Sequence, residues 1–211
     1  MKKYAILFSA VCALLLAFSQ NAKADAIFTS SLDTGNSAIA GFLMPGEQFG
    51  TVTVSVSGTT ATITFTANTA GGFEFIDTSA AAVNLASGID PSTAMIVTDT
   101  QFKAFDSGKN VDGFGIFNLS VNNKDGSGSP VDTIVFTVTV PSGTLDSAVL
   151  AFNSKGFDAA AHISVNGGVA TGFAGEAQEG GGHVPDGGAT AVLLGLGLAG
   201  LGGLYAKFGR K

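Results

Sequence analysis

The chain has 211 residues, no tryptophan and one cysteine, and its formal charge at neutral pH is −6. All sixteen acidic residues fall between positions 25 and 186, where four lysines oppose them, so four positive against sixteen negative charges give this segment −12. A surface this acidic repels nucleic acid, and no basic patch interrupts it, which excludes nucleic-acid binding.

The N-terminus predicts a cleaved secretory signal peptide over residues 1–24. A positively charged start is followed by an apolar stretch over 4–18, and Ala22 and Ala24 give the small-x-small pattern that signal peptidase requires. We therefore expect export by the Sec machinery and a mature chain that begins at the next residue. Cys12 lies in the removed stretch, so the mature chain would have no disulfide and no cysteine nucleophile or metal ligand.

Strict alternation of apolar and hydroxyl side chains over 50–57 and 60–67 predicts a β-hairpin. The residues expected to face the core are Val52, Val54, Val56, Ala61, Ile63 and Phe65. The connection at 58–59 contains a glycine, as short hairpin turns prefer.

Weaker patterns predict further strands and one uncertain segment. The expected strands are 73–77, 94–99, 113–121, 133–140, 148–153 and 162–165, and residues 80–86 could instead form a helical turn. Short strands separated by turn-forming residues are typical of an antiparallel β-sandwich, either jelly-roll-like or immunoglobulin-like, over residues 25–171. Residues 172–183 are rich in Gly, Glu and Gln, and we interpret them as a flexible linker.

Catalytic patterns are weak in the exported segment. His162 and His183 are its histidines, no Gly-x-Ser-x-Gly elbow is present, and we interpret His162 as a strand-edge residue. Glu74 and Asp77 could serve as paired carboxylates, but among sixteen acids any such pair can be chosen. The tyrosines lie only in the two ends and tryptophan is absent, which removes the usual sugar-stacking rings. We predict that the chain is not an enzyme.

Two loops contain groups of oxygen-bearing side chains of the kind that bind calcium. Residues 106–113 place oxygen-bearing side chains at alternate positions, and Asn122, Asn123 and Asp125 offer a second group. Neither completes an EF-hand loop, and Asn and Asp in loops most often cap turns. We therefore predict no metal site and no cofactor.

The C-terminal residues 184–211 have three parts. Val184, Pro185, Asp186, Gly187 and Gly188 precede an uncharged run over 189–206, and the basic residues Lys207, Arg210 and Lys211 follow it. As a helix this run is about 27 Å long, close to the hydrocarbon thickness of a membrane, so it predicts a transmembrane helix. Because positive residues stay on the cytoplasmic side, the preceding domain would face the exterior.

This three-part order resembles the tail of PEP-CTERM proteins, and more closely its VPDSG-type variant, with Gly187 where that variant has serine. The resemblance implies that exosortase, a membrane protease, recognises Val184 to Gly188 and that the basic end acts as a stop. It also implies passage through the inner membrane of a Gram-negative-type bacterium to the envelope or extracellular matrix. Exopolysaccharide becomes a candidate partner on the same ground.

We predict a non-catalytic exported envelope or matrix protein that exosortase sorts through its tail. Two alternatives remain open. The domain could be a surface carbohydrate-binding module or hydrolase, or the chain could be permanently anchored by one uncleaved span.

Overall fold

The computed structural model describes residues 26–106, 108–124, 129–145 and 149–176, which form an all-β domain with two single-turn 3₁₀ helices. Within these ranges, no helix has the length and apolar character needed to cross a membrane. The predicted transmembrane helix at 189–206 and the predicted signal peptide lie outside the described residues.

The elements follow one another along the chain with short connections. They are β1 (Ala26–Gly35), η1 (Ala40–Phe42), β2 (Gly50–Ser57), β3 (Thr60–Ala67), η2 (Thr69–Gly71), β4 (Phe73–Phe75), β5 (Ala81–Val83), β6 (Met95–Thr98), β7 (Phe102–Phe105), β8 (Lys109–Val111), β9 (Gly115–Phe117), β10 (Leu119–Asn123), β11 (Thr133–Thr139), β12 (Ala159–Val165) and β13 (Ala170–Glu176).

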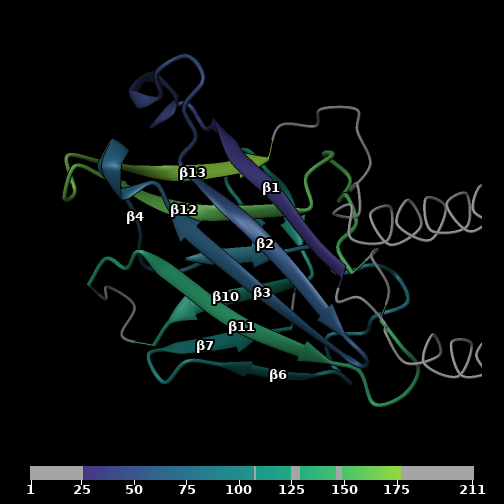
Figure 1. Ribbon diagram of the computed structural model, residues 1–211. Coiled ribbons are helices and arrows are strands. Elements are labelled where there is room, and N and C mark those ends of the chain that lie inside the picture. Colours follow the sequence, from purple (N-terminus) through teal and green to yellow (C-terminus); the bar gives the residue numbers. More distant parts are fainter. Residues whose placement is uncertain (1–25, 107, 125–128, 146–148, 177–211) are drawn as a thin grey trace, which may run out of the picture. The chain divides into compact units, whose positions relative to one another are not determined.

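Most strands belong to one antiparallel sheet of eleven strands. Its order is β6-β11-β3-β2-β1-β13-β12-β5-β10-β7, and β4 pairs with β12 beside this path. The sheet rolls up until its two end strands meet at a short turn, where the Thr98 hydroxyl donates a hydrogen bond of 3.0 Å to the Phe102 carbonyl. The result is a nearly closed wall around the core (Figure 1).

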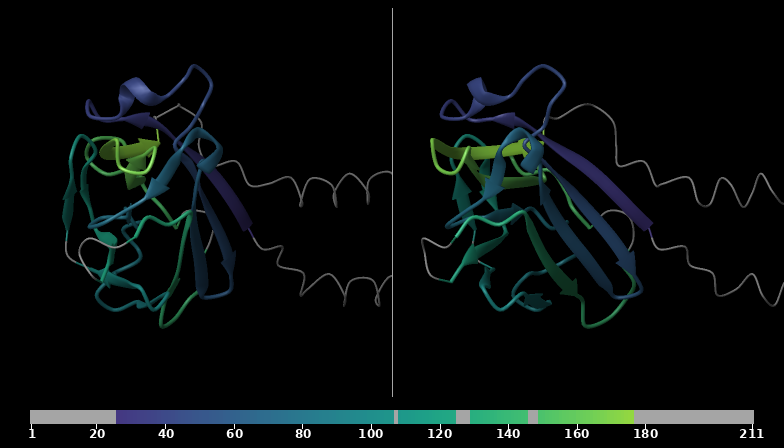
Figure 2. Two further views of the ribbon diagram at one scale, coloured as in Figure 1. Left: turned by 90° about the vertical axis from the view of Figure 1, so that its left-hand side faces the viewer. Right: turned by 60° about the vertical axis from the view of Figure 1, so that its left-hand side comes forward.

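The predicted antiparallel, mainly β class is confirmed, but the two separate sheets of a sandwich are not what forms. β1 pairs with both β2 and β13, and β12 pairs with both β13 and β5, so hydrogen bonds run without a break from one side of the domain to the other. A register shift between Leu32 and Thr34 lets β1 bend as it passes from one neighbour to the other. Figure 2 shows the purple and blue strands along one side of the roll.

The predicted hairpin is present with its predicted strand bounds. β2 and β3 pair from Gly50 opposite Ala67 to Ser57 opposite Thr60. Gly58, at the turn, has a φ of 61°, a left-handed conformation that glycine adopts without a Cβ clash. All six predicted core residues of this hairpin are buried.

Phenylalanine rings fill the space that the roll encloses. Phe65 of β3 lies 6.1 Å from Phe75 and 6.3 Å from Phe136, measured between ring centroids, so one ring joins β3, β4 and β11. A second, smaller cluster lies under the β8–β9 hairpin, where Phe114 and Phe117 are buried with Ala160. This hairpin therefore covers part of the outer surface of the sheet.

Several strand predictions need correction. The run 113–121 divides into β9 and β10, with Asn118 between them bonding through its side chain to the backbone of Leu85. The described part of 148–153 makes a single bridge, Leu85 to Leu150, rather than a strand. Residues 81–83 form β5 instead of a helical turn, because their three buried side chains fit between β10 and β12.

The linker prediction is wrong at its start. Residues 172–176 belong to β13, which lies between β1 and β12 in the sheet. Glycine suits this strand because a Cβ at Gly175 would come within 2.5 Å of the Phe114 ring. The glycines that suggested flexibility are therefore a packing requirement here, and the rest of the predicted linker lies outside the described residues.

Candidate functional site

The residues with predicted sorting roles all lie outside the described part of the chain. They are Ala22 and Ala24 at the signal-peptide cleavage site, Val184, Pro185, Asp186, Gly187 and Gly188 in the motif, and Lys207, Arg210 and Lys211 in the basic end. Their roles remain predictions, and the described domain offers four other places where polar groups gather.

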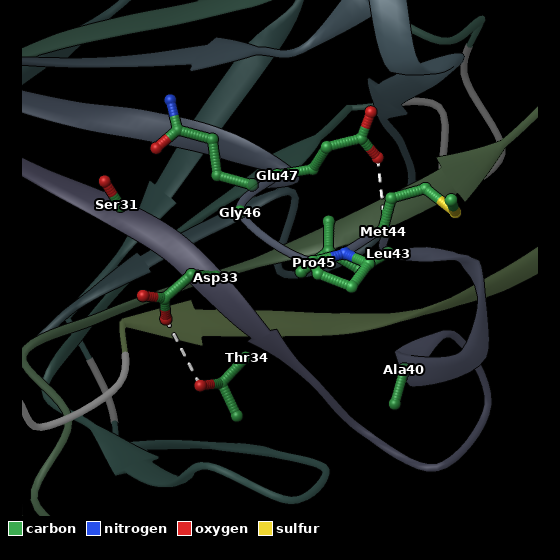
Figure 3. A pocket seen from close by; sticks show the side chains of 10 residues that line it. Ser31, Asp33, Thr34, Ala40, Leu43, Met44, Pro45, Gly46 and Glu47 are labelled. Carbon is green, nitrogen blue, oxygen red and sulfur yellow. Dashed lines mark hydrogen bonds between the residues drawn. The ribbon is translucent and has the colours of Figure 1, made fainter.

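The first is an open hollow of about 580 Å³ beside β1 (Figure 3). Asp33 and Glu47 line it, but both carboxylates already hold local structure. Asp33 accepts a hydrogen bond of 3.2 Å from the Thr34 hydroxyl, and Glu47 accepts one of 3.2 Å from the Met44 backbone N–H. No histidine, lysine or cysteine is among the lining residues, so these two carboxylates are the ionisable side chains of the hollow.

The second place is an open slot of about 620 Å³ between the two end strands. Ile96, Phe102 and Leu119 line its apolar part, whereas Lys103 and Lys124 stand with Asp106 in its polar part. The Lys103 ammonium lies 5.1 Å from the centroid of the Phe105 ring. Charges of both signs therefore line the slot, two positive and one negative.

The third place is His162, which lies on β12, an interior strand, and not at a strand edge as predicted. Its ring stacks on Phe173 at a centroid distance of 4.4 Å, and its Nδ1 atom is buried without a hydrogen-bond partner. Burial lowers the pKa of His162, against the smaller opposing effects of the Asp77 carboxylate and a hydrogen bond to the Thr78 backbone. The His162 imidazole is therefore neutral and stacked on Phe173 at neutral pH.

The segment beside His162 is strained. Asp77 and Ser79 have φ values of 55° and 54°, which non-glycine residues rarely adopt. The Ser79 backbone N–H donates to the Asn122 side-chain oxygen over 2.7 Å, and the Ser79 carbonyl accepts from the His162 backbone N–H. Both contacts engage the backbone of Ser79, and neither aligns its hydroxyl with the imidazole.

Two of the loop residues considered for calcium accept hydrogen bonds from distant parts of the chain, and Asp125 lies outside the described residues. Asp112 accepts a hydrogen bond of 3.2 Å from the Asn36 side chain, and Asn122 caps the turn at Ser79. Within the described ranges no group of three or more His, Cys, Asp or Glu side chains is arranged to hold a metal ion.

The fourth place was not foreseen, and it joins two carboxyl groups inside the sheet. Asp158, just before β12, is fully buried, and Glu176 ends β13 beside it. Burial, together with a hydrogen bond to Asp158 and the Asp158 charge, raises the pKa of Glu176 to about 8, while a hydrogen bond from Ser30 acts in the opposite direction. The nearby Asp33 carboxylate adds to the increase. Glu176 is therefore protonated at neutral pH and can donate a hydrogen bond to Asp158.

No sequence pattern indicated this pair, because eighteen positions of chain separate the two residues and only the β12–β13 register brings them together. A glutamate in a glycine-rich segment is expected to be exposed to solvent, and the linker prediction therefore placed Glu176 outside the folded domain.

This pair makes stability depend on pH. The folded pKa of Glu176, about 8, is above the unfolded value of about 4.5, so the folded state keeps a proton that the unfolded chain releases between these values. The free energy of unfolding should therefore fall as pH rises from about 4.5 to about 8. Glu176→Gln, which stays neutral, should remove this fall and add about 2 kcal/mol at pH 8.5, given about 1.4 kcal/mol per pKa unit and partial solvent access.

The measurement is urea unfolding of the full-length chain from pH 5 to pH 9. Glu74→Gln on β4 is the matched control for the loss of one glutamate charge. A Glu176→Gln variant with the same pH dependence as the original chain would contradict the assigned pair.

Comparison with known proteins identifies the tail. Residues 183–208 match the family model described as the VPDSG-CTERM motif. They are a PEP-CTERM-like exosortase sorting signal. The VPDSG-CTERM motif implies an exported protein that exosortase processes, with an envelope or extracellular destination. No curated protein and no solved structure matches the chain.

Proposed function

We propose that the chain is a non-catalytic exported protein of the cell envelope or extracellular matrix, delivered by exosortase through residues 184–211. The VPDSG-CTERM motif carries this proposal. Its motif, apolar run and basic end follow one another in the order expected of a segment that exosortase recognises beside a predicted transmembrane helix. The signal-peptide pattern at 1–24 supplies the export step that must come first.

The non-catalytic part of the proposal is supported by the contents of the described hollows. In the β1 hollow the carboxylates accept hydrogen bonds from Thr34 and Met44, and the slot between β6 and β7 is lined by two lysines and Asp106. His162 is stacked on Phe173 with a lowered pKa, and its strained neighbours bond through the backbone. An acid–base or nucleophilic pair requires two side chains aligned with each other, and these places supply structural contacts instead.

The decisive experiment is the intact mass of the protein from the native envelope and medium. We expect a chain that begins at Asp25 and ends near residues 184–188 in a strain with its exosortase. In a strain without the exosortase, the chain should run to Lys211 and remain in the membrane fraction. A chain that reaches Lys211 in both strains would show instead a permanent single-span anchor.

A further inference from the structure

The central part of one outer face of the rolled sheet carries no charged side chain, and Asp33 on β1 lies at its rim beside Ser31. The face spans β1, β2, β3, β11 and β6, which lie side by side in Figure 1, and we name it the hydroxyl face. Its residues are Ile27, Thr29, Ser31, Thr51, Thr53, Ser55, Ser57, Thr60, Thr62, Thr64, Thr66, Thr133, Val135, Thr137, Thr139, Met95 and Val97. Each alternates with a core residue and keeps part of its surface open to solvent.

The strand registers place these side chains in rows across the sheet. Thr29 stands opposite Thr53, which stands opposite Thr64, and the row continues to Val135. Neighbouring hydroxyl groups bond to each other, with 3.3 Å between Thr29 and Thr53. A second such bond of 3.0 Å joins Thr60 to Thr139 at the other end of the face. The spacing between rows is that of alternate strand residues, about 6.6 Å, and the spacing within a row is about 4.8 Å.

The absence of charge stands out against the rest of the exported segment. That segment carries −12, and exposed acids lie outside the strands of this face, among them Asp90 and Asp112. High β-propensity explains why threonine is frequent in strands, but lysine and glutamate are the residues that usually protect an end strand such as β6. β6 instead presents Met95 and Val97, which are 61% and 51% exposed.

We propose that the hydroxyl face binds the hydroxyl face of a second copy of this chain. Depletion of charge in the central part of a surface is the compositional mark of a protein–protein interface. The self-complementary patch of a two-fold dimer requires one surface that can meet itself, and an uncharged face does so without opposing carboxylates. Two sheets that pack face to face lie about 10 Å apart, close enough for threonine and valine methyl groups to interdigitate.

The exposed apolar residues favour a second copy over a neutral polysaccharide. Ile27, Val97 and Val135 are each more than two-fifths exposed on this face, and a polyhydroxylated chain would leave them largely in water. The face also has no aromatic ring on which a sugar could stack. The hydroxyl face of a second copy would bury these apolar side chains and would also pair with the hydroxyl groups.

Screening gives the interface a characteristic salt dependence. Because both copies are strongly acidic while the contact itself is neutral, added salt weakens their long-range repulsion and leaves the contact unchanged. Association should therefore strengthen as ionic strength rises, opposite to the behaviour of an interface held by ion pairs.

The test uses single cysteines in the full-length chain in its native envelope. In a Cys12→Ala background the chain has no other thiol, and Thr62→Cys places one at the centre of the face. A short bismaleimide should give a cross-linked dimer, increasing as ionic strength is raised from about 0.01 M to about 0.15 M, where the screening length falls from about 30 Å to about 8 Å. Thr171→Cys, exposed on β13 outside the face, is the matched control and should give several-fold less dimer.

A second substitution separates specific packing from random collision. Adding Thr64→Glu or Thr64→Lys to Thr62→Cys should each abolish the dimer, because a charge of either sign would be buried in a neutral contact. Equal cross-linking at Thr62 and Thr171, or dimer formation that survives both charges, would overturn the proposal. A monomer that binds a neutral glucan or an ice surface through Thr62 and Thr64 would overturn it as well. The result does not depend on exosortase, since full-length and processed chains both carry the face.

Discussion

Replacing Pro185, Asp186 and Gly187 by alanine should abolish C-terminal processing, so that the exported chain is recovered up to Lys211. Proline and glycine disfavour helix, so we expect the motif to be extended and open to a protease. Alanine is the strongest helix former and would let the apolar helix extend backward through the motif. The measurement is the intact mass of the chain from washed membranes and from the medium.

The matched control replaces Gly180, Gly181 and Gly182 by alanine. It makes the same kind of change just upstream and leaves the motif intact, so it should be processed normally. Normal processing of the motif variant would show that the protease reads the apolar helix and basic end alone. Loss of processing in both variants would show that it requires chain flexibility rather than the motif.

The strands that could be predicted are those whose own residues alternate between apolar and polar. β2, β3 and β11 alternate strictly, because one face meets the core and the other meets solvent, and each was predicted within one residue of its bounds. β1 was missed because Ser30, on its inward side, interrupts the apolar alternation between Phe28 and Leu32.

The parts that could not be predicted depend on partners distant in the chain. β13 contains glycine where strands usually have β-branched residues, and it forms because β1 and β12 supply hydrogen bonds on both sides. The Asp158–Glu176 pair follows from that register, so it was invisible for the same reason. The hydroxyl face could be predicted in part. The sequence shows the alternating threonines within single strands, but the extent of the face over five strands depends on the strand order.

The VPDSG-CTERM motif shows the opposite case. Its information is local, because exosortase processes a linear segment, and the motif was recognised without a fold. What the domain itself does depends on surfaces assembled from several strands, which a linear pattern does not reveal.

Phe65→Ala should destabilise the domain by about 3–5 kcal/mol, the usual cost of removing a fully buried phenylalanine. Phe65 is fully buried and its ring contacts Phe75 and Phe136, so the cavity would open where β3, β4 and β11 meet. Domains of this size have about 5–15 kcal/mol of stability, so the loss is a large fraction of the total. The midpoint of thermal unfolding should fall by about 10 °C.

Phe42→Ala is the matched control, since Phe42 is 40% exposed in η1 and the same truncation there should change the midpoint little. A Phe65→Ala midpoint equal to that of the control would contradict the rolled core.

In cells the two kinds of variant should separate folding from sorting. The motif variant should accumulate as a stable full-length membrane protein, whereas Phe65→Ala should be processed at an intact motif but recovered in smaller amounts, because its unfolded fraction is open to proteases. The domain and its tail would then be independent, one determining persistence and the other destination.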